Sequence, residues 1–478
     1  MKQARQIMRM GVAAVVAGLV LGLVVFLLIP VAFPGPAPDS TPASPAPEVL
    51  AAAEATALPP LDPEAPTPDT AALKSALDTA LTAGATGATV TGAVIDVATG
   101  RELYSRSGDE PGIPASSLKV LTAIAATHEL GEEHRFTTKT LLTGTDTVVL
   151  VGGGDVLLGT GKDSGAVSGR ASLDTLAQDT AKALEEAQTA GTVGNKLRIE
   201  LDESLFSGPA LNPAWDSSLV TTHNISPISP LAMYGARDTA DPKAERVADP
   251  GLYAAAAFSR ALGAALADSG SKLTLSGEPT RTEGAAEGAA EGAELASIDS
   301  ATLGEQVRFM LEDSDNYVAE TLGRLVAVAR QEPGDHAHGA AAVGTVVEGL
   351  GIDTSKMALV DTSGLAHSNR VSPLTLASAL GYAATSEHAS LRNLGYRLPV
   401  AGATGTMSNR LGAQSTRGIV RAKTGSLLEV SSLSGLTVSR DGRALAFSFF
   451  VHTTDGAIAP HKHVLDAAAA ALTGCGCR

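Results

Sequence analysis

Three short polar strings, in a fixed order along the chain, contain the side chains of a nucleophilic serine site. They are, in chain order, Ser116-Ser117-Leu118-Lys119, Ser314-Asp315-Asn316 and Lys423-Thr424-Gly425. A serine hydroxyl is a weak nucleophile at its ordinary pKa, so a base must take its proton as it attacks. On a helix, the spacing of Ser116 and Lys119 sets a hydroxyl and an amine one turn apart on the same face. The strings therefore predict acyl transfer through a serine.

Coarse secondary structure places each string on a suitable element. Pro114 precedes apolar residues at helical spacing, so Ser116 should lie in the first turn of a helix. The second string lies in a polar stretch between two apolar stripes, which predicts a loop between packed helices. The third string ends a strand over residues 418–427, and a hairpin over residues 430–452 follows it. With a further hairpin over residues 89–105, this order predicts an α+β domain with an antiparallel sheet flanked by helices.

The N-terminal part has the composition of an anchor and a spacer. Residues 1–9 are basic, and the 23 residues from Gly11 to Phe33 have no charge and are long enough to cross a bilayer. We expect residues 10–33 to be an uncleaved transmembrane signal anchor, because they end without the small-residue site of a cleaved signal peptide. Residues 34–70, rich in proline and alanine, should be a linker. The chain after residue 33 would then lie outside the cytoplasm, held at the cell membrane by a single span. It would be secreted if residues 10–33 are cleaved off.

Charge and cysteine content exclude several classes of protein. The formal net charge is −16 at pH 7, and no basic stripe is present to neutralise nucleic-acid phosphates. The two cysteines, Cys475 and Cys477, lie at the C-terminal end, where they cannot hold a fold together. We expect neither a nucleic-acid partner nor a disulfide framework.

No string predicts a metal or a cofactor. His336 and His338 lie in a polar stretch, where a solvated loop is favoured over a metal site because no third ligand is near. The glycines at 152–154 lack the Gly-Lys-Ser continuation of a phosphate loop. A second Ser-x-x-Lys string, from Ser269 to Lys272, leads into a strand-like segment, so we interpret it as structural.

The three strings in this order resemble the penicillin-binding protein and serine β-lactamase superfamily. The resemblance implies a transpeptidase-like α+β fold. Ser116 and Ser314 stand 198 residues apart, whereas a compact class A β-lactamase has far less chain there, so a large inserted domain is expected. Such an insertion is similar to that of the low-molecular-mass class C penicillin-binding proteins, the D-alanyl-D-alanine carboxypeptidases and endopeptidases of peptidase family S13.

Shorter strings along the chain resemble the same family. They are Gly152-Gly153-Gly154-Asp155, Asp202-Glu203-Ser204-Leu205-Phe206, Asp361-Thr362-Ser363-Gly364-Leu365, Asn369-Arg370-Val371-Ser372-Pro373 and Gly405-Thr406. The resemblance runs from about residue 71 to the end. It implies a peptidase domain over residues 71–134 and 301–478, with the inserted domain over residues 135–300.

Chemistry and resemblance together give the site residues roles. Ser116 would attack and become acylated, Lys119 would be its base, and Ser314 would pass a proton to the departing amine. Burial near another cation, Lys423, would lower the pKa of Lys119 and leave part of it neutral. The backbone N–H groups of Ser116 and Ser426 resemble the family's oxyanion hole.

A second set of residues is expected to bind the substrate. These residues are Asn316, Lys423, Thr424, Gly425, Ser426 and Asp155. Lys423, Thr424 and Ser426 would hold a terminal carboxylate, and Asn316 would hold an amide. By resemblance, Asp155 would meet the amine of a diamino acid in the substrate; the alternative is an acidic residue in a turn.

The resemblance implies a serine-type D-Ala-D-Ala carboxypeptidase or endopeptidase. Its substrate would be a peptidoglycan stem peptide or the cross-link between two stems, and β-lactam antibiotics would inhibit it. Two alternatives remain. One is a β-lactamase, which must hydrolyse penicilloyl-serine efficiently, and the other is a non-enzymatic penicillin-binding sensor or wall-binding protein.

Overall fold

The computed structural model describes residues 62, 64–162, 164–282, 292–454, 458 and 461–476. The expected anchor at 10–33, most of the linker, residues 283–291 and Cys477 lie outside the described residues. Within these ranges, no helix is both long enough and apolar enough to span a bilayer. Residues 60–478 form one compact unit that contains two sheets.

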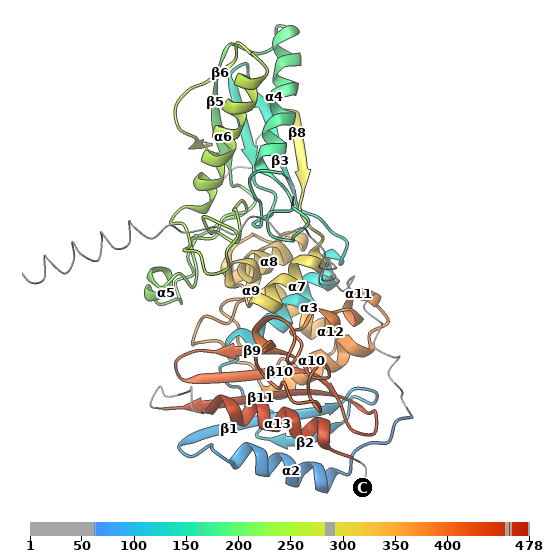
Figure 1. Cartoon of the computed structure of the whole chain (residues 1–478). Coiled ribbons are helices and arrows are strands. Elements are labelled where there is room, and N and C mark those ends of the chain that lie inside the picture. The colour runs from blue at the N-terminus through green and yellow to red at the C-terminus, as the bar shows by residue number, and fades with distance from the viewer. Residues whose placement is uncertain are drawn as a thin grey trace, which may run out of the picture. The chain divides into compact units, whose positions relative to one another are not determined.

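A five-stranded antiparallel sheet, in the order β2-β1-β11-β10-β9, supports the catalytic part of this unit (Figure 1). Its strands are β1 (Ala88–Asp96), β2 (Glu102–Arg106), β9 (Arg421–Ser426), β10 (Val430–Val438) and β11 (Ala444–Thr453). Both expected hairpins are confirmed, because β1 pairs with β2 and β10 pairs with β11. The pairing of β1 with β11 joins the first and last parts of the sheet.

Helices cover both faces of this sheet, as β11 illustrates. Its residues Phe447 and Phe449 face one apolar core, whereas Ala446 and Phe450 face another, as expected for alternating strand residues. The first core is closed by α2 (Thr70–Thr82) and α13 (Lys462–Gly474). Helices on the other side are α3 (Lys119–Leu130), α7 (Leu303–Asp313), α8 (Asn316–Ala329), α9 (His336–Gly349), α10 (Pro373–Thr385), α11 (Ala389–Arg392) and α12 (Leu394–Arg397). The expected α+β arrangement is confirmed.

The segment between α3 and α7 builds a second sheet, in the order β6-β5-β4-β3-β8, with β7 beside β5. Its strands are β3 (Thr137–Thr143), β4 (Thr147–Val151), β5 (Lys196–Asp202), β6 (Thr274–Leu275), β7 (Thr280–Arg281) and β8 (Ala293–Asp299). Helices α4 (Leu173–Thr189) and α6 (Pro250–Asp268) share a separate apolar core with it. Because β3 pairs with β8, the chain leaves and re-enters the catalytic part on adjacent strands. We refer to residues 137–299 as the insertion.

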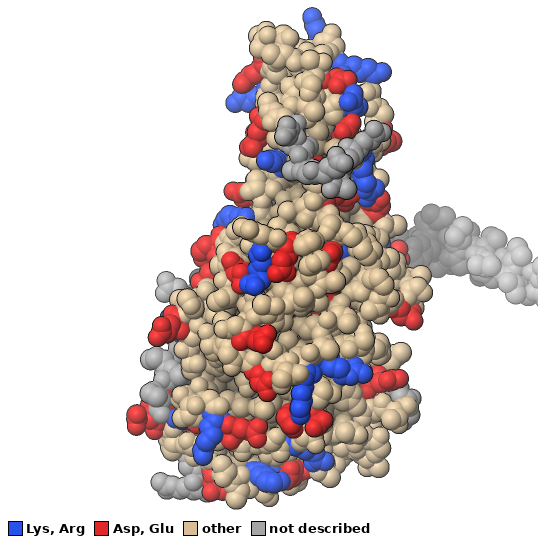
Figure 2. All heavy atoms as spheres, turned by 180° about the vertical axis from the view of Figure 1, so that it is seen from behind, with Lys and Arg blue, Asp and Glu red and all other residues tan. Residues whose placement is uncertain are grey.

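The charged side chains on the face seen in Figure 2 are of both signs and interspersed. No broad basic patch covers this face of the described chain.

A buried ion pair connects the start of the sheet to its end. Arg443 Nε and Nη2 donate to the two carboxylate oxygens of Asp96 at 2.9 and 2.8 Å. Arg443 Nη1 also donates to the carbonyl of Ala65 at 2.9 Å, so the pair fixes the segment before α2 as well.

Replacing one partner should leave the other charge buried and uncompensated. We expect Asp96→Asn to destabilise the protein by about 3 kcal/mol, because removing one member of a buried pair costs roughly that much. Urea unfolding followed by tryptophan fluorescence would measure the loss. An unchanged midpoint would mean that the pair contributes nothing to stability.

Candidate active site

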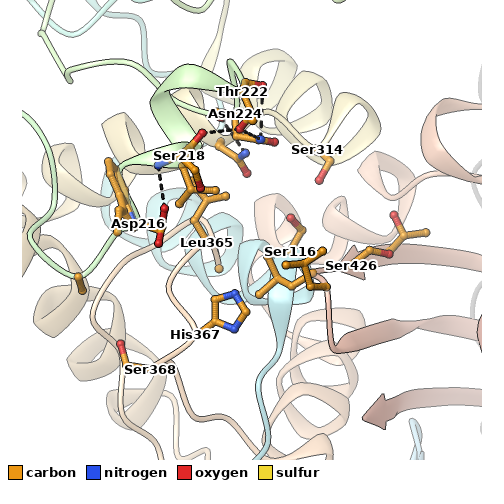
Figure 3. A pocket seen from close by; sticks show the side chains of 18 of the residues that line it. Ser116, Asp216, Ser218, Thr222, Asn224, Ser314, Leu365, His367, Ser368 and Ser426 are labelled. Carbon is orange, nitrogen blue, oxygen red and sulfur yellow. Dashed lines mark hydrogen bonds between the residues drawn. The ribbon is translucent and has the colours of Figure 1, made fainter. Parts of the chain in front are cut away.

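The three strings meet at one cavity of about 1020 Å³ (Figure 3). Five of their residues and near neighbours line it, and these are Ser116, Ser314, Asn316, Thr424 and Ser426. Lys119 and Lys423 lie directly behind this lining and are fully buried. Gly425 also lies behind it: a Cβ there would come within 2.9 Å of the Ser116 nitrogen, so only glycine lets β9 approach so closely. The structure thus brings together every site residue expected from the sequence except Asp155.

Ser116 lies on a 3-10 turn, Ala115–Leu118, that leads directly into α3. The expected position at a helix start is confirmed. Ala115 has a φ of +46°, a conformation that residues with a Cβ rarely adopt. Gly364, with φ +84°, packs against it so closely that a Cβ would lie 1.9 Å from the Ala115 oxygen. Strained backbone held by tight packing therefore presents the Ser116 hydroxyl to the cavity.

Lys119 points at Ser116. Its Nζ donates to Ser116 Oγ at 3.0 Å, to Asn316 Oδ1 at 2.7 Å and to the Ser363 carbonyl at 2.6 Å. Burial lowers the pKa of Lys119 to about 8, although nearby carboxylates oppose the shift. A substantial fraction of Lys119 is therefore neutral near pH 8, as a general base requires.

Lys423 makes a similar contact with the second serine. Its Nζ donates to Ser314 Oγ at 2.9 Å and to the Thr424 carbonyl at 2.7 Å. Burial, and then the Lys119 cation, hold the pKa of Lys423 well below its usual range. For Lys119, burial is the largest cause of the lowered pKa, as expected, and the cation that adds to the effect is Arg246.

The second string joins two helices, as expected. Ser314 ends α7 in the left-handed conformation, and Asn316 begins α8. Between them, Asp315 is buried and pairs with Arg237 and Arg246 of the insertion at 2.8 and 3.0 Å. Two cations from the insertion thus fix the loop that presents Ser314.

The insertion also forms one wall of the cavity, and the residues of this wall were not identified from the sequence. Trp215, Asp216 and Leu219 line this wall, close to the short helix α5 (Ser218–Thr221). Asn224 accepts a hydrogen bond from Asn316 Nδ2 at 3.0 Å through its backbone oxygen. The lone tryptophan, in a polar turn, was the signal that could have identified this wall.

Asp155 does not line the cavity. It is buried, and its carboxylate accepts a hydrogen bond from the Leu157 N–H at 2.9 Å. Burial raises the pKa of Asp155 to about 7. This local hydrogen bond fits the alternative of an acidic residue in a turn, and Asp216 is the one carboxylate among the described residues that line the cavity.

Two other sequence interpretations can be compared with the structure. Ser269 caps the end of α6 and donates to the Leu266 carbonyl at 3.0 Å, which confirms its structural role. The solvated loop expected at His336 is wrong, because this residue begins α9 and is buried against Glu320. Three or more possible metal ligands do not gather anywhere in the described part of the chain.

The sequence matches the D-Ala-D-Ala carboxypeptidase 3 (S13) family over residues 73–251 and 235–472. The chain belongs to this family. Carboxypeptidase DacB of Mycolicibacterium smegmatis is 35% identical over 426 residues, which cover 87% of each chain. Carboxypeptidase Rv3627c of Mycobacterium tuberculosis is 33% identical over 440 residues, which cover 87% of this chain and 90% of the relative.

This chain also has the same fold as a protein of known structure. The crystal structure of penicillin binding protein 4 (dacB) from Haemophilus influenzae superposes with a TM-score of 0.64 at 22% identity, covering 81% of this chain and 97% of the other. The expectation of a serine-type D-Ala-D-Ala carboxypeptidase with a penicillin-binding-protein fold is confirmed.

The site predicts a pH dependence for acylation. Protonated Lys119 cannot accept the Ser116 proton, so the second-order rate constant for acylation by a labelled penicillin should rise with pH and level off above about 8. Stopped-flow or gel-based labelling between pH 6 and 10 would give the profile. A flat profile would argue against Lys119 as the base.

Proposed function

We propose that this S13 peptidase cleaves the terminal D-Ala-D-Ala bond, or the corresponding cross-link, of peptidoglycan stem peptides through an acyl-enzyme at Ser116. The observation that carries the assignment of residues is the 3.0 Å contact between Lys119 Nζ and Ser116 Oγ inside the cavity. Two relatives that are named carboxypeptidases, and that match this chain over most of their length, support the choice of substrate.

Acylation uses both Ser–Lys pairs. Neutral Lys119 takes the proton of Ser116, and Oγ attacks the carbonyl carbon of the penultimate D-alanine. The backbone N–H groups of Ser116 and Ser426 stabilise the oxyanion. Ser314 gives its proton to the departing amine as the C–N bond breaks, and the Lys423 ammonium, which donates to Ser314 Oγ, replaces that proton. Free D-alanine leaves. Water then attacks the ester and returns a proton to Lys423 through Ser314, while protonated Lys119 gives its proton back to Ser116 Oγ as the ester bond breaks.

The terminal carboxylate of the substrate binds beside β9. Thr424 and Ser426 line the cavity there and can donate hydrogen bonds, while Lys423 supplies the charge. An anionic ligand raises the pKa of a nearby lysine, so the substrate favours the protonated form of Lys423. Asn316 holds a substrate amide at the other side.

An amine on the stem peptide meets Asp216 rather than Asp155. Asp216 lies on the wall formed by the insertion, and its carboxylate accepts a hydrogen bond from the Ser218 N–H at 2.8 Å. As the one acidic residue of the described lining, Asp216 would attract the side-chain amine of a diamino acid.

β-Lactams act as inhibitors that acylate Ser116. The penicillin binding protein 4 of Haemophilus influenzae has been solved in complex with a novel β-lactam, with a TM-score of 0.56 to this chain at 20% identity. Two further proposals concern location: residues 10–33 anchor the protein in the cell membrane, and the peptidase acts outside the cytoplasm.

Ser116→Ala should abolish both covalent labelling by a penicillin and release of D-alanine from a pentapeptide, because among the described residues Ser116 alone offers Lys119 a hydroxyl. The matched control is Ser269→Ala, which removes the serine of the second Ser-x-x-Lys string and should change neither measurement. Persistent labelling of Ser116→Ala would contradict the assignment. If the wild type instead releases penicilloic acid within seconds, the β-lactamase alternative is correct.

The anchor is tested by fractionation. Full-length protein should sediment with membranes and dissolve only in detergent, because 23 uncharged residues suffice to cross a bilayer. A chain lacking residues 1–33 should be soluble and keep its carboxypeptidase activity. Recovery of a shortened natural chain from the medium would show cleavage instead.

A further inference from the structure

Two buried side chains in hydrogen-bond contact, His336 and Glu320, lie behind Lys119 and outside the cavity. His336 Nδ1 and Glu320 Oε2 are 3.3 Å apart, and the two residues are only 5% and 2% exposed. Neither side chain lines the cavity. A buried carboxylate such as Glu320 is costly unless polar groups contact it, so its contacts indicate what it holds in place.

Glu320 reaches the base through two peptide groups. Its Oε1 accepts hydrogen bonds from the N–H groups of Thr362 at 3.0 Å and of Ser363 at 2.8 Å. The carbonyl of Ser363 in turn accepts the 2.6 Å hydrogen bond from Lys119. The carboxylate therefore sets the position of a backbone acceptor that the ammonium group uses directly.

The segment that transmits this contact is fixed between two helices. Thr122 of α3 donates to the Thr362 carbonyl at 2.6 Å, and the Thr362 hydroxyl donates to the Ala319 carbonyl of α8 at 3.0 Å. Asn316 and Glu320 lie one turn apart on α8. One face of this helix therefore holds Lys119 directly through Asn316, and indirectly through Glu320 and the backbone of residues 362–363.

A second carboxylate fixes the same segment to the cavity wall. Asp361 accepts hydrogen bonds from the Gly364 N–H at 2.9 Å and from Trp215 Nε1 at 2.9 Å. The Trp215 ring meets the His336 ring edge to face, with centroids 5.0 Å apart. The contact between His336 and Glu320 is thus part of a continuous set of contacts that runs from the cavity wall at Trp215 to Lys119.

We propose that Glu320, held by His336, is a positioning residue that aims the Ser363 carbonyl at Lys119 and places negative charge behind it. The inference rests on the proposed role of Lys119 as the base. Glu320 acts through the backbone and touches no reacting atom.

Titratable and charged groups from several elements lie near Lys119 and near Glu320. Those near Lys119 are Asp315, Glu320, Asp361, Arg246 and Lys423. Those near Glu320 are His336, Arg324 and Asp361. The carboxylates hold the pKa of Lys119 higher than burial alone would set it. Removing the charge of Glu320 should therefore lower the pKa of Lys119 further.

Two variants separate charge from position. Glu320→Gln keeps an acceptor for the two amides but loses the charge, so the midpoint of the acylation pH profile should fall by roughly one pH unit. Glu320→Asp keeps the charge but is one methylene too short for the amides. Its plateau rate should fall about tenfold or more, with the midpoint nearly unchanged, because the base is misplaced.

The role of His336 is tested in the same assay. His336→Ala leaves Glu320 without its partner and should lower the plateau rate. His336→Gln, whose amide can donate to Glu320, should recover part of that rate. Each rate is normalised to the folded fraction, and Asp96→Asn is the control, since it removes a buried carboxylate of an ion pair elsewhere and should leave profile and rate per folded molecule unchanged.

The outcomes are distinguishable. If folded Glu320→Gln and Glu320→Asp both match Asp96→Asn in midpoint and plateau, the positioning role is wrong. If Glu320→Gln does not fold, Glu320→Asp and the His336 pair decide: wild-type rates in all of them overturn the proposal. A flat wild-type profile, or a normal rate in Lys119→Ala, would instead overturn the role of Lys119 itself.

Discussion

Two fully buried lysine side chains, Lys119 and Lys423, impose the main constraint on this fold. A buried ammonium group is costly unless oxygen acceptors surround it. Lys119 finds its acceptors on the 3-10 turn before α3, on α8 and on the segment before α10. Lys423 finds one of its acceptors at the end of α7. Because these elements are far apart in the sequence, the helices and the sheet must be packed together before either lysine can be buried.

The insertion belongs to this arrangement as much as the sheet does. It supplies Arg237 and Arg246, which neutralise Asp315 of the second string, and Trp215, which donates to Asp361. Its paired terminal strands, β3 and β8, let a long segment enter and leave at one place without disturbing the helices on either side. The insertion is therefore a supporting part of the active site, as well as one of its walls.

Local patterns explain what the sequence could predict. The helix start at Ser116, the first hairpin and the last hairpin follow from spacing, alternation and turn residues, and all are present. His336 was misplaced because its polar neighbours suggested a solvated loop, whereas burial depends on partners distant in sequence. His336 is buried because Glu320, sixteen residues earlier on another helix, faces it. No local signal identifies such a partner. The cavity position of Asp155 came from the family resemblance, and the alternative of an acidic residue in a turn fits the structure better.

The uneven distribution of carboxylates gives the two lysines different chemistry. Burial lowers the pKa of Lys119 to about 8 against the opposing effect of Asp361, Asp315 and Glu320. For Lys423, burial and then the Lys119 cation both lower the pKa. A substrate carboxylate beside Lys423 would stabilise the charge there, and the resulting like-charge repulsion would favour neutral Lys119. Binding of the correct substrate terminus would then itself prepare the base, which links recognition to catalysis within a single pair of lysines.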